Sequence, residues 1–196
     1  MSSNTRNQLE RWLKTIDVNG YVLDVGGSVQ TLEGRVKSFS PKKYLIMDNG
    51  SEKGLHGKWI KPDIKWDISD PMSGNEFDNR FDQVFMIEVS EYIFDPYLAL
   101  LNVRDMLKDD GIFYSSWHFI YCQHPPKGRD ILRYTPDGVK FLLDKAGFKI
   151  VENIPRVLKD DFSKSTLMAL ITNEGMRGWK NFDNEVIGSL ITARKI

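Results

Sequence analysis

Short apolar runs alternate with longer amphipathic stretches along this 196-residue chain, and that alternation limits the fold more than any other feature. The apolar runs have the length of buried strands, whereas the stretches between them carry apolar residues at the spacing of a helix face. Strands that alternate with helices of this length imply a mostly parallel sheet that helices cover on both faces. The sequence therefore predicts an α/β protein.

The predicted strands, in chain order, are residues 21–25, 44–47, 64–66, 81–89, 112–119, 148–154 and 187–193. The predicted helices are residues 4–16, 29–38, 96 to about 110, 136–146 and 162–173. Pro96 and Pro136 suit the first turn of a helix, where the missing N–H is not needed. Thr135 is the expected N-cap of the helix at 136–146, and Gly147 is its expected C-terminal glycine.

Length and composition fit a single folded domain over residues 1–196, with an N-terminal helix within 1–18 and an insertion at 155–184 before the last strand. Hydrophobic residues make up 41% and charged residues 28%, as in globular proteins and unlike disordered chains. The formal net charge is zero, so no general attraction to nucleic acid or anionic membranes is indicated.

Cys122 is the single cysteine, which excludes an internal disulfide and a cysteine-rich metal site. No apolar run reaches the roughly 20 residues that a membrane helix needs. Residues 1–11 are polar and lack the apolar core of a signal peptide. We therefore expect a cytoplasmic protein without a membrane segment or a bound metal.

Glycines and acidic residues follow three of the predicted strands. Asp24, Gly26 and Gly27 end the first strand, Asp48 follows the second, and Asp67 follows the third. Ligands of open parallel sheets bind beyond the carboxyl ends of the strands. These residues are therefore expected to meet at one edge of the sheet and to border a common ligand.

Each part of this set has a physical use. Gly26 and Gly27 let a ligand approach the main chain, and the start of the helix predicted at 29–38 offers free N–H groups to an anion. Asp48 has two acceptor oxygens for the paired hydroxyls of a ribose, Asp67 can accept from the amine of adenine, and Asp24 can hold an ammonium group directly or through water. A nucleoside joined to an amino acid fits this set better than a dinucleotide does.

Blocks of sequence over residues 21–151 resemble the class I S-adenosylmethionine-dependent methyltransferases, in the family's order. They are residues 22–27 (VLDVGG), 44–48 (YLIMD), 66–68 (WDI), 81–89 (FDQVFMIEV), 106–114 (MLKDDGIFY), 134–138 (YTPDG) and 146–148 (AGF). The resemblance implies a Rossmann-like methyltransferase fold, with a seven-stranded, mostly parallel sheet, helices on both faces and an antiparallel last strand. It also implies S-adenosylmethionine as the cofactor.

By this resemblance the cofactor lies against residues from four strand ends. The methionine part of the cofactor would border Asp24, Gly26, Gly27 and Ser28. The ribose would lie against Asp48, with Asn49 beside it, and the adenine would lie against Asp67 and Ile68. The sulfonium would lie near Ile87 and Glu88. The chain departs from the family in two places. Ser28, Val29 and Gln30 stand where further glycines are common, and Glu91-Tyr92 stands where many relatives have Glu-His.

Methyl transfer from a sulfonium mainly requires alignment of donor and acceptor, and a base is needed only if the acceptor must lose a proton. His118 is a candidate base, and His124, Arg129 and Arg133 are candidates for holding an anionic substrate group. Each of them also fits a packed histidine or a solvated loop residue. Residues 124–136 faintly resemble methyltransferases of sugar or surface-polysaccharide pathways. The expected acceptor is a small molecule or a saccharide.

Two other hypotheses remain open at this point. A nicotinamide-dependent oxidoreductase shares the glycine turn and the acid after the second strand, but the G-x-G-x-x-G pattern is absent, because residues 26–31 read GGSVQT. A catalytically inactive binding protein with the methyltransferase fold would explain the altered glycine segment and the missing histidine.

Overall fold

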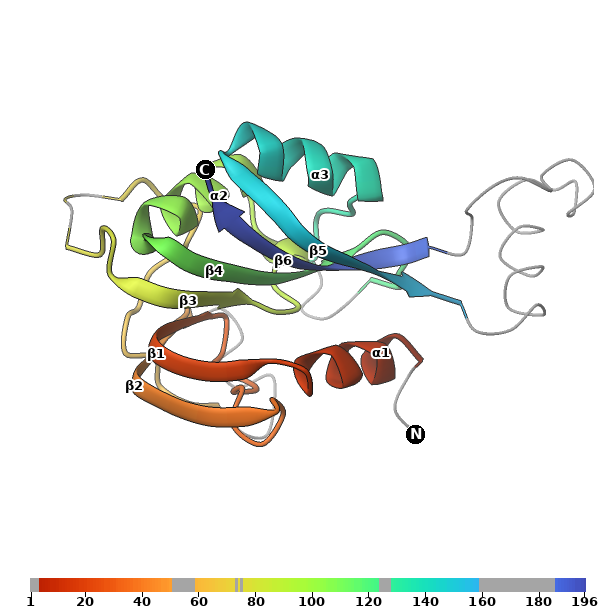
Figure 1. Ribbon diagram of the computed structural model, residues 1–196. Helices are drawn as coiled ribbons and strands as arrows, with labels where there is room; N and C mark the ends of the chain where they lie inside the picture. The colour runs from red at the N-terminus through yellow and green to blue at the C-terminus, as the bar shows by residue number, and fades with distance from the viewer. Residues whose placement is uncertain (1–3, 51–58, 73, 75, 124–127, 159–185) are drawn as a thin grey trace, which may run out of the picture.

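The computed structural model describes residues 4–50, 59–72, 74, 76–123, 128–158 and 186–196 of the chain. One sheet in the order β2-β1-β3-β4-β6-β5 runs through the molecule (Figure 1). Its strands are β1 (Asp17–Val25), β2 (Ser38–Met47), β3 (Phe81–Met86), β4 (Leu107–His118), β5 (Phe148–Val157) and β6 (Val186–Lys195). The pairs β1–β2, β1–β3 and β3–β4 are parallel, whereas β6 is antiparallel to both β4 and β5. The prediction of an antiparallel last strand is confirmed.

The expectation of seven strands is wrong by one, because the described residues form six. The segment predicted as a strand at 64–66 makes a single parallel bridge, between Met47 and Ile64. The Ile46 N–H donates to the side chain of Asp63 at 2.9 Å, in the place where a further ladder bond would form. Pro62 has no N–H to offer to a ladder. The pairing therefore stops at the edge of β2.

Within the described ranges, three α-helices cover the sheet: α1 (Asn4–Leu13), α2 (Pro96–Met106) and α3 (Pro136–Lys145). The Thr135 side chain accepts from the Gly138 N–H, which confirms the predicted N-cap, and Gly147 has φ +83° after α3. Helix α2 ends earlier than predicted because β4 already begins at Leu107. The helix predicted at 162–173 and most of the proposed insertion at 155–184 lie outside the described residues.

The helix predicted at 29–38 does not form, since residues 26–37 are turns and bends that lead directly into β2. Gly34 has φ +77°, which a right-handed helix does not accommodate. The Lys14 ammonium donates to the Gly34 carbonyl at 2.8 Å and so ties the segment to the end of α1. Leu32 and Val36 are buried against α1. Tertiary packing onto α1 therefore replaces the helix that the apolar spacing suggests.

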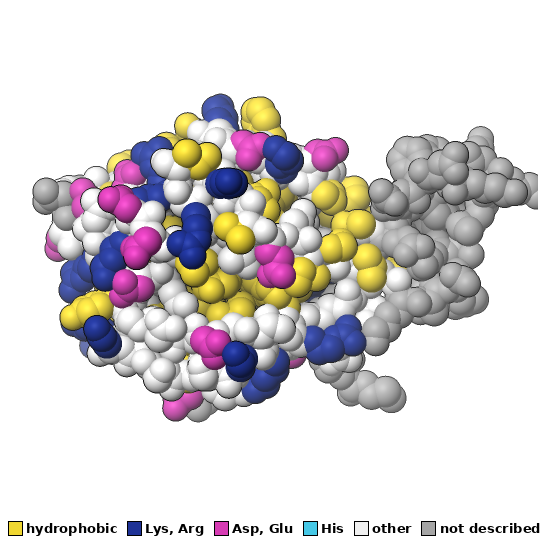
Figure 2. Space-filling model, in the orientation of Figure 1, with side chains coloured by type: hydrophobic (Ala, Val, Ile, Leu, Met, Phe, Trp, Pro, Cys, Tyr) yellow, Lys and Arg dark blue, Asp and Glu magenta, His cyan; other side chains and the backbone are white. Residues whose placement is uncertain are grey.

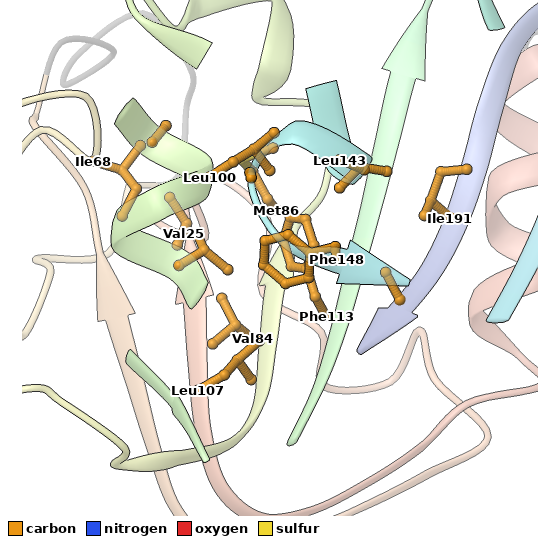
Figure 3. Close-up of a cluster of buried hydrophobic side chains, with 14 of the residues drawn as sticks. Val25, Ile68, Val84, Met86, Leu100, Leu107, Phe113, Leu143, Phe148 and Ile191 are labelled. Atoms are coloured by element: carbon orange, nitrogen blue, oxygen red, sulfur yellow. The ribbon is translucent and has the colours of Figure 1, made fainter. Parts of the chain in front are cut away.

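The core has two parts, one on each face of the sheet. On one face, α2 and α3 pack over the strands, and Figure 3 shows Leu100 and Leu143 with Met86, Phe113 and Phe148 in this cluster. On the other face, Leu9, Trp12 and Leu13 of α1 pack with strand residues such as Val22, Phe85 and Tyr114. Helices on both faces are confirmed.

Charged side chains of both signs are interspersed on the face shown in Figure 2, with hydrophobic side chains gathered near its centre. This distribution agrees with a chain that has 27 basic and 27 acidic residues. Among the described residues, no helix has the length and apolar character to cross a membrane.

Candidate functional site

A pocket opens at the carboxyl ends of β1, β2 and β3, where the strand order reverses. It encloses about 550 Å³ of space not filled by atoms, part of which is open to solvent. In open α/β sheets this reversal is the usual ligand position. Six residues that the sequence assigns to a cofactor line the pocket, namely Gly26, Asp48, Asn49, Asp67, Ile68 and Glu88.

Two carboxylates face this pocket, Asp48 directly after β2 and Asp67 three residues after the bridge at Ile64. The Oδ1 atom of Asp48 accepts from the Gly50 N–H at 2.6 Å, while its Oδ2 atom has no hydrogen-bond partner in the described part of the chain. Asp67 accepts from the N–H and Oγ of Ser69 and from the Asn49 amide at 2.8 Å. Burial alone would raise the pKa of Asp67, but these hydrogen bonds outweigh it and lower the pKa. Asp67 is therefore ionised at neutral pH, and both side chains are held in place.

The glycine turn borders the pocket through Gly26. Gly26 has φ +77°, and its N–H donates to the Met47 carbonyl at 2.7 Å. A Cβ atom here would lie 2.4 Å from Cγ2 of Val89, so no other residue fits without movement of Val89. The Val89 side chain thus packs directly over the turn, and both residues line the pocket.

Asp24 lies behind the glycine turn. Its side chain is 2% exposed and accepts a hydrogen bond from the Tyr44 hydroxyl. A Cβ atom on Gly27 would lie 2.4 Å from Oδ2 of Asp24, so Gly27 packs against the carboxyl group. Burial raises the pKa of Asp24 to about 7, although the hydrogen bond from Tyr44 acts in the opposite direction. A ligand ammonium group would need this closed arrangement to open before it could reach Asp24.

Ser28 and Ile87 also lie away from the pocket. Ser28 is fully buried, and its carbonyl accepts from the Ile60 N–H at 2.7 Å. Ile87 packs on the other face of the sheet, with the cluster that contains α1. Because residues 26–37 form turns, the described chain has no helix N-terminus after Gly27 to offer the row of N–H groups that the sequence predicts.

Glu88 occupies the pocket wall in an unusual conformation. Its φ is +57°, which is uncommon for a residue with a side chain and is typical of constrained, functional positions. Its Oε1 atom accepts from Ser116 Oγ and from Arg156 Nη1, both at 2.7 Å. Its Oε2 atom lies 3.0 Å from His118 Nε2 and 3.5 Å from Arg156 Nη2. Burial alone would raise the pKa of Glu88, but His118 and Arg156 outweigh it and hold the pKa below its ordinary value.

His118 is 1% exposed and has neighbours at both ring nitrogens. Arg156 Nη1 lies 3.5 Å from Nδ1, and Oε2 of Glu88 lies 3.0 Å from Nε2. Nε2 also lies 3.5 Å from Oε1 of Glu91, which is itself buried. Burial raises the pKa of Glu91, His118 opposes this, and the charge of Glu88 raises it further. The histidine thus acts inside a buried charged cluster, defined as Glu88, Glu91, His118 and Arg156.

The residues predicted on the substrate side are spread over the loop after β4. His124 lies outside the described residues. Arg129 is exposed. Arg133 pairs with Asp130, with Nη2 at 2.7 Å from Oδ2, and donates to the Cys122 carbonyl at 3.2 Å. Arg133 therefore stabilises the loop to which it belongs. Neither Arg129 nor Arg133 lines the pocket that contains Glu88.

Several residues of this region lie outside the site that the sequence predicts. Trp66, Val89, Tyr92 and Ile93 line the pocket, and Arg156 holds Glu88 from β5. The signal for Trp66 was its place directly before Asp67 at the third strand end. Nothing in the sequence around Arg156 marks it, because the contact joins positions 68 residues apart.

No family model matches the sequence, and no curated protein shows significant similarity to it. Solved structures are similar in fold. An S-adenosylmethionine-dependent methyltransferase from Mesorhizobium loti is 15% identical, with a TM-score of 0.63 over 97% of this chain and 98% of that chain.

Two further structures show how broad this fold is. The Burkholderia thailandensis 1,6-didemethyltoxoflavin-N1-methyltransferase, solved with its substrate and S-adenosylhomocysteine, is 16% identical, with a TM-score of 0.53 over 97% of this chain and 76% of that chain. The cyclase SpnF is 15% identical, with a TM-score of 0.53 over 98% and 81%. The sheet order, the antiparallel β6 and these matches together show that the chain has the fold of the class I S-adenosylmethionine-dependent methyltransferases.

Proposed function

We propose that the chain binds S-adenosylmethionine in this pocket and transfers the methyl group to a small-molecule or saccharide acceptor. The convergence of Asp48 and Asp67 with Gly26 on one pocket carries the proposal. Neighbours of the same fold are named as methyltransferases, and one of them was solved with S-adenosylhomocysteine. One neighbour of the same fold is a cyclase, so the fold by itself does not determine the reaction.

The residues present fit the adenosyl part of this cofactor. Asp48 would accept from the ribose hydroxyls, since its Oδ2 atom has no hydrogen-bond partner in the described chain. Asp67 and Asn49 would border the polar edge of adenine, while Trp66 and Ile68 would cover its ring. Bound S-adenosylmethionine supplies an electrophilic methyl group on its sulfonium. The task of the chain is to orient the ligand and to keep water from it.

The described pocket wall offers no ready general base. Glu88 lies there, but its pKa is lowered and its carboxylate is held by Ser116, His118 and Arg156. His118 has both ring nitrogens engaged in the buried charged cluster. Acceptors that need no strong base, such as amines or acidic hydroxyls, therefore suit the site best.

A second candidate is a binding protein that holds the ligand without turnover. The closed position of Asp24 and the packing of Val89 over Gly26 favour it. The nicotinamide hypothesis has less support, because no helix N-terminus follows the glycine turn in the described chain to receive a pyrophosphate.

A labelling experiment tests catalysis. The protein is incubated with S-adenosylmethionine tritiated on the methyl group and a deproteinised cell extract, and the products are separated from the cofactor. We expect label in a small-molecule fraction only when the protein is present, and less of it with the Asp48→Ala variant. Cofactor binding without transfer of label to any fraction would favour the binding protein.

Replacement of Asp48 by alanine should weaken binding of S-adenosylhomocysteine by about 1–3 kcal/mol, because the ribose hydroxyls lose a fixed acceptor. Isothermal titration calorimetry measures the change, roughly 5- to 150-fold in Kd. Asp70→Ala is the matched control, since Asp70 is an exposed acid near Asp67 that does not line the pocket. An unchanged Kd for Asp48→Ala would remove Asp48 from the ribose site.

A further inference from the structure

We infer that the pocket recognises the nucleoside end of its ligand and gains little affinity from the amino-acid end, so that a thioether nucleoside without the amino acid binds as tightly as S-adenosylhomocysteine. The inference rests on the proposed function, because it concerns the ligand proposed for the same pocket. It makes 5′-thioadenosines the ligand class of this site.

The fixed polar groups of the pocket lie on its nucleoside side. Asp48 is held by the Gly50 N–H, and Asp67 is held by Ser69 and Asn49. Groups fixed before binding lose little conformational entropy when the ligand arrives. This end of the pocket is therefore well suited to hydroxyl and amine donors.

At the glycine turn, where an amino-acid end would lie, two polar groups are turned away from a ligand. The Gly26 N–H is already bonded to the Met47 carbonyl, and the methyl groups of Val89 stand against Gly26. Asp24 is buried behind Gly27. A ligand ammonium group at this turn meets an apolar wall.

Glu88 is also a poor partner for a ligand ammonium. A carboxylate has about four acceptor positions, and Ser116, His118 and Arg156 make four contacts with the two oxygens of Glu88. A new cation would have to displace one of these buried partners. The exchange of one charged hydrogen bond for another gives little net affinity.

The carboxylate of an amino-acid end has no cationic partner either. The charged residues among the described lining are Asp48, Asp67 and Glu88, all of them acids. The remaining described lining is mostly apolar or aromatic, as at Trp66 and Ile93. Ordinarily a single hydrogen bond to a charged group changes affinity by roughly 10- to 150-fold. Because the described lining offers no free charged partner to either end of the amino acid, we expect nearly equal affinities.

Isothermal titration calorimetry with S-adenosylhomocysteine and with 5′-methylthioadenosine tests the inference. We expect Kd values within about threefold of each other. S-adenosylhomocysteine binding more than threefold more tightly would overturn the inference and leave the proposed function standing. Binding of 5′-methylthioadenosine without any binding of S-adenosylhomocysteine would overturn both, because the amino-acid end would then oppose binding. Failure of both ligands to bind would overturn both.

Two matched variants locate the affinity within the pocket. Asp67→Asn should weaken both ligands by a similar factor, because it changes the nucleoside side. Asp24→Asn should leave both Kd values within about twofold of the wild type, since the buried carboxyl group does not reach the ligand. A selective loss of S-adenosylhomocysteine affinity in Asp24→Asn would show that Asp24 holds the amino group and would overturn the inference.

Discussion

Replacement of Arg156 by methionine is expected to lower the free energy of unfolding by about 3–5 kcal/mol, the usual effect of removing one partner from a buried ion pair. Arg156 is 1% exposed, and its guanidinium donates to Glu88 at 2.7 Å and to the Thr5 carbonyl at 3.1 Å. Without it, Glu88 keeps its charge in a largely buried position, and β5 loses one of its hydrogen bonds to α1, while those between Val157 and Gln8 remain. Chemical denaturation measures the effect, and in a domain of this size it corresponds to a fall in Tm of about 6–20 °C.

The control for this variant lies on the same strand. Lys149 is exposed on β5, so Lys149→Met should change stability by less than about 0.5 kcal/mol. The double variant Arg156→Met, Glu88→Gln should recover part of the loss, because it removes the charge left without its partner. A loss below about 1 kcal/mol in Arg156→Met would mean that the buried charged cluster does not depend on this arginine.

The Asp24→Asn variant is expected to become progressively more stable than the wild type as the pH rises from about 4 to about 7. The pKa of Asp24 is raised from 3.8 to about 7 by burial. In the unfolded chain the carboxyl group loses its proton near pH 4, whereas in the folded chain it keeps the proton up to about pH 7. The contribution of Asp24 to wild-type stability is therefore greatest below the unfolded pKa and falls across this interval, by up to about 4 kcal/mol.

Asparagine does not titrate, and its side-chain oxygen can still accept the hydrogen bond from Tyr44. Urea denaturation of both proteins at several pH values between 4 and 8 measures the difference. Asp17→Asn is the control on the same strand, because Asp17 is exposed and its pKa is lowered by Ser38 and Lys37. It should bring no gain at high pH. A constant difference between Asp24→Asn and the wild type at all pH values would mean that Asp24 titrates normally.

Two residues of this region, Asp24 and His118, have other roles in the structure than the sequence predicts. Asp24 was predicted to hold the amino group of a ligand, yet its side chain is buried against Gly27 and accepts a hydrogen bond from the Tyr44 hydroxyl. His118 was a candidate base, and it lies between Glu88 and Arg156. In both cases a residue expected to contact a ligand contacts other buried residues. The pKa shifts of Asp24 and Glu91 arise from that burial, which no sequence pattern reports.

The sequence by itself determined the α/β class, most strands and the positions of α1, α2 and α3, because apolar periodicity and helix capping are local properties. It also determined that Asp48 and Asp67 meet beside Gly26, since the carboxyl ends of parallel strands share one edge of a sheet.

Only the tertiary structure decided the rest. Residues 29–38 have helical spacing but pack onto α1 as turns, and residues 64–66 make one bridge because Asp63 takes the N–H of the edge strand. The buried charged cluster joins three strand ends and a short connection through contacts distant in sequence. Burial and side-chain direction depend on the whole sheet, and the local sequence does not contain that information.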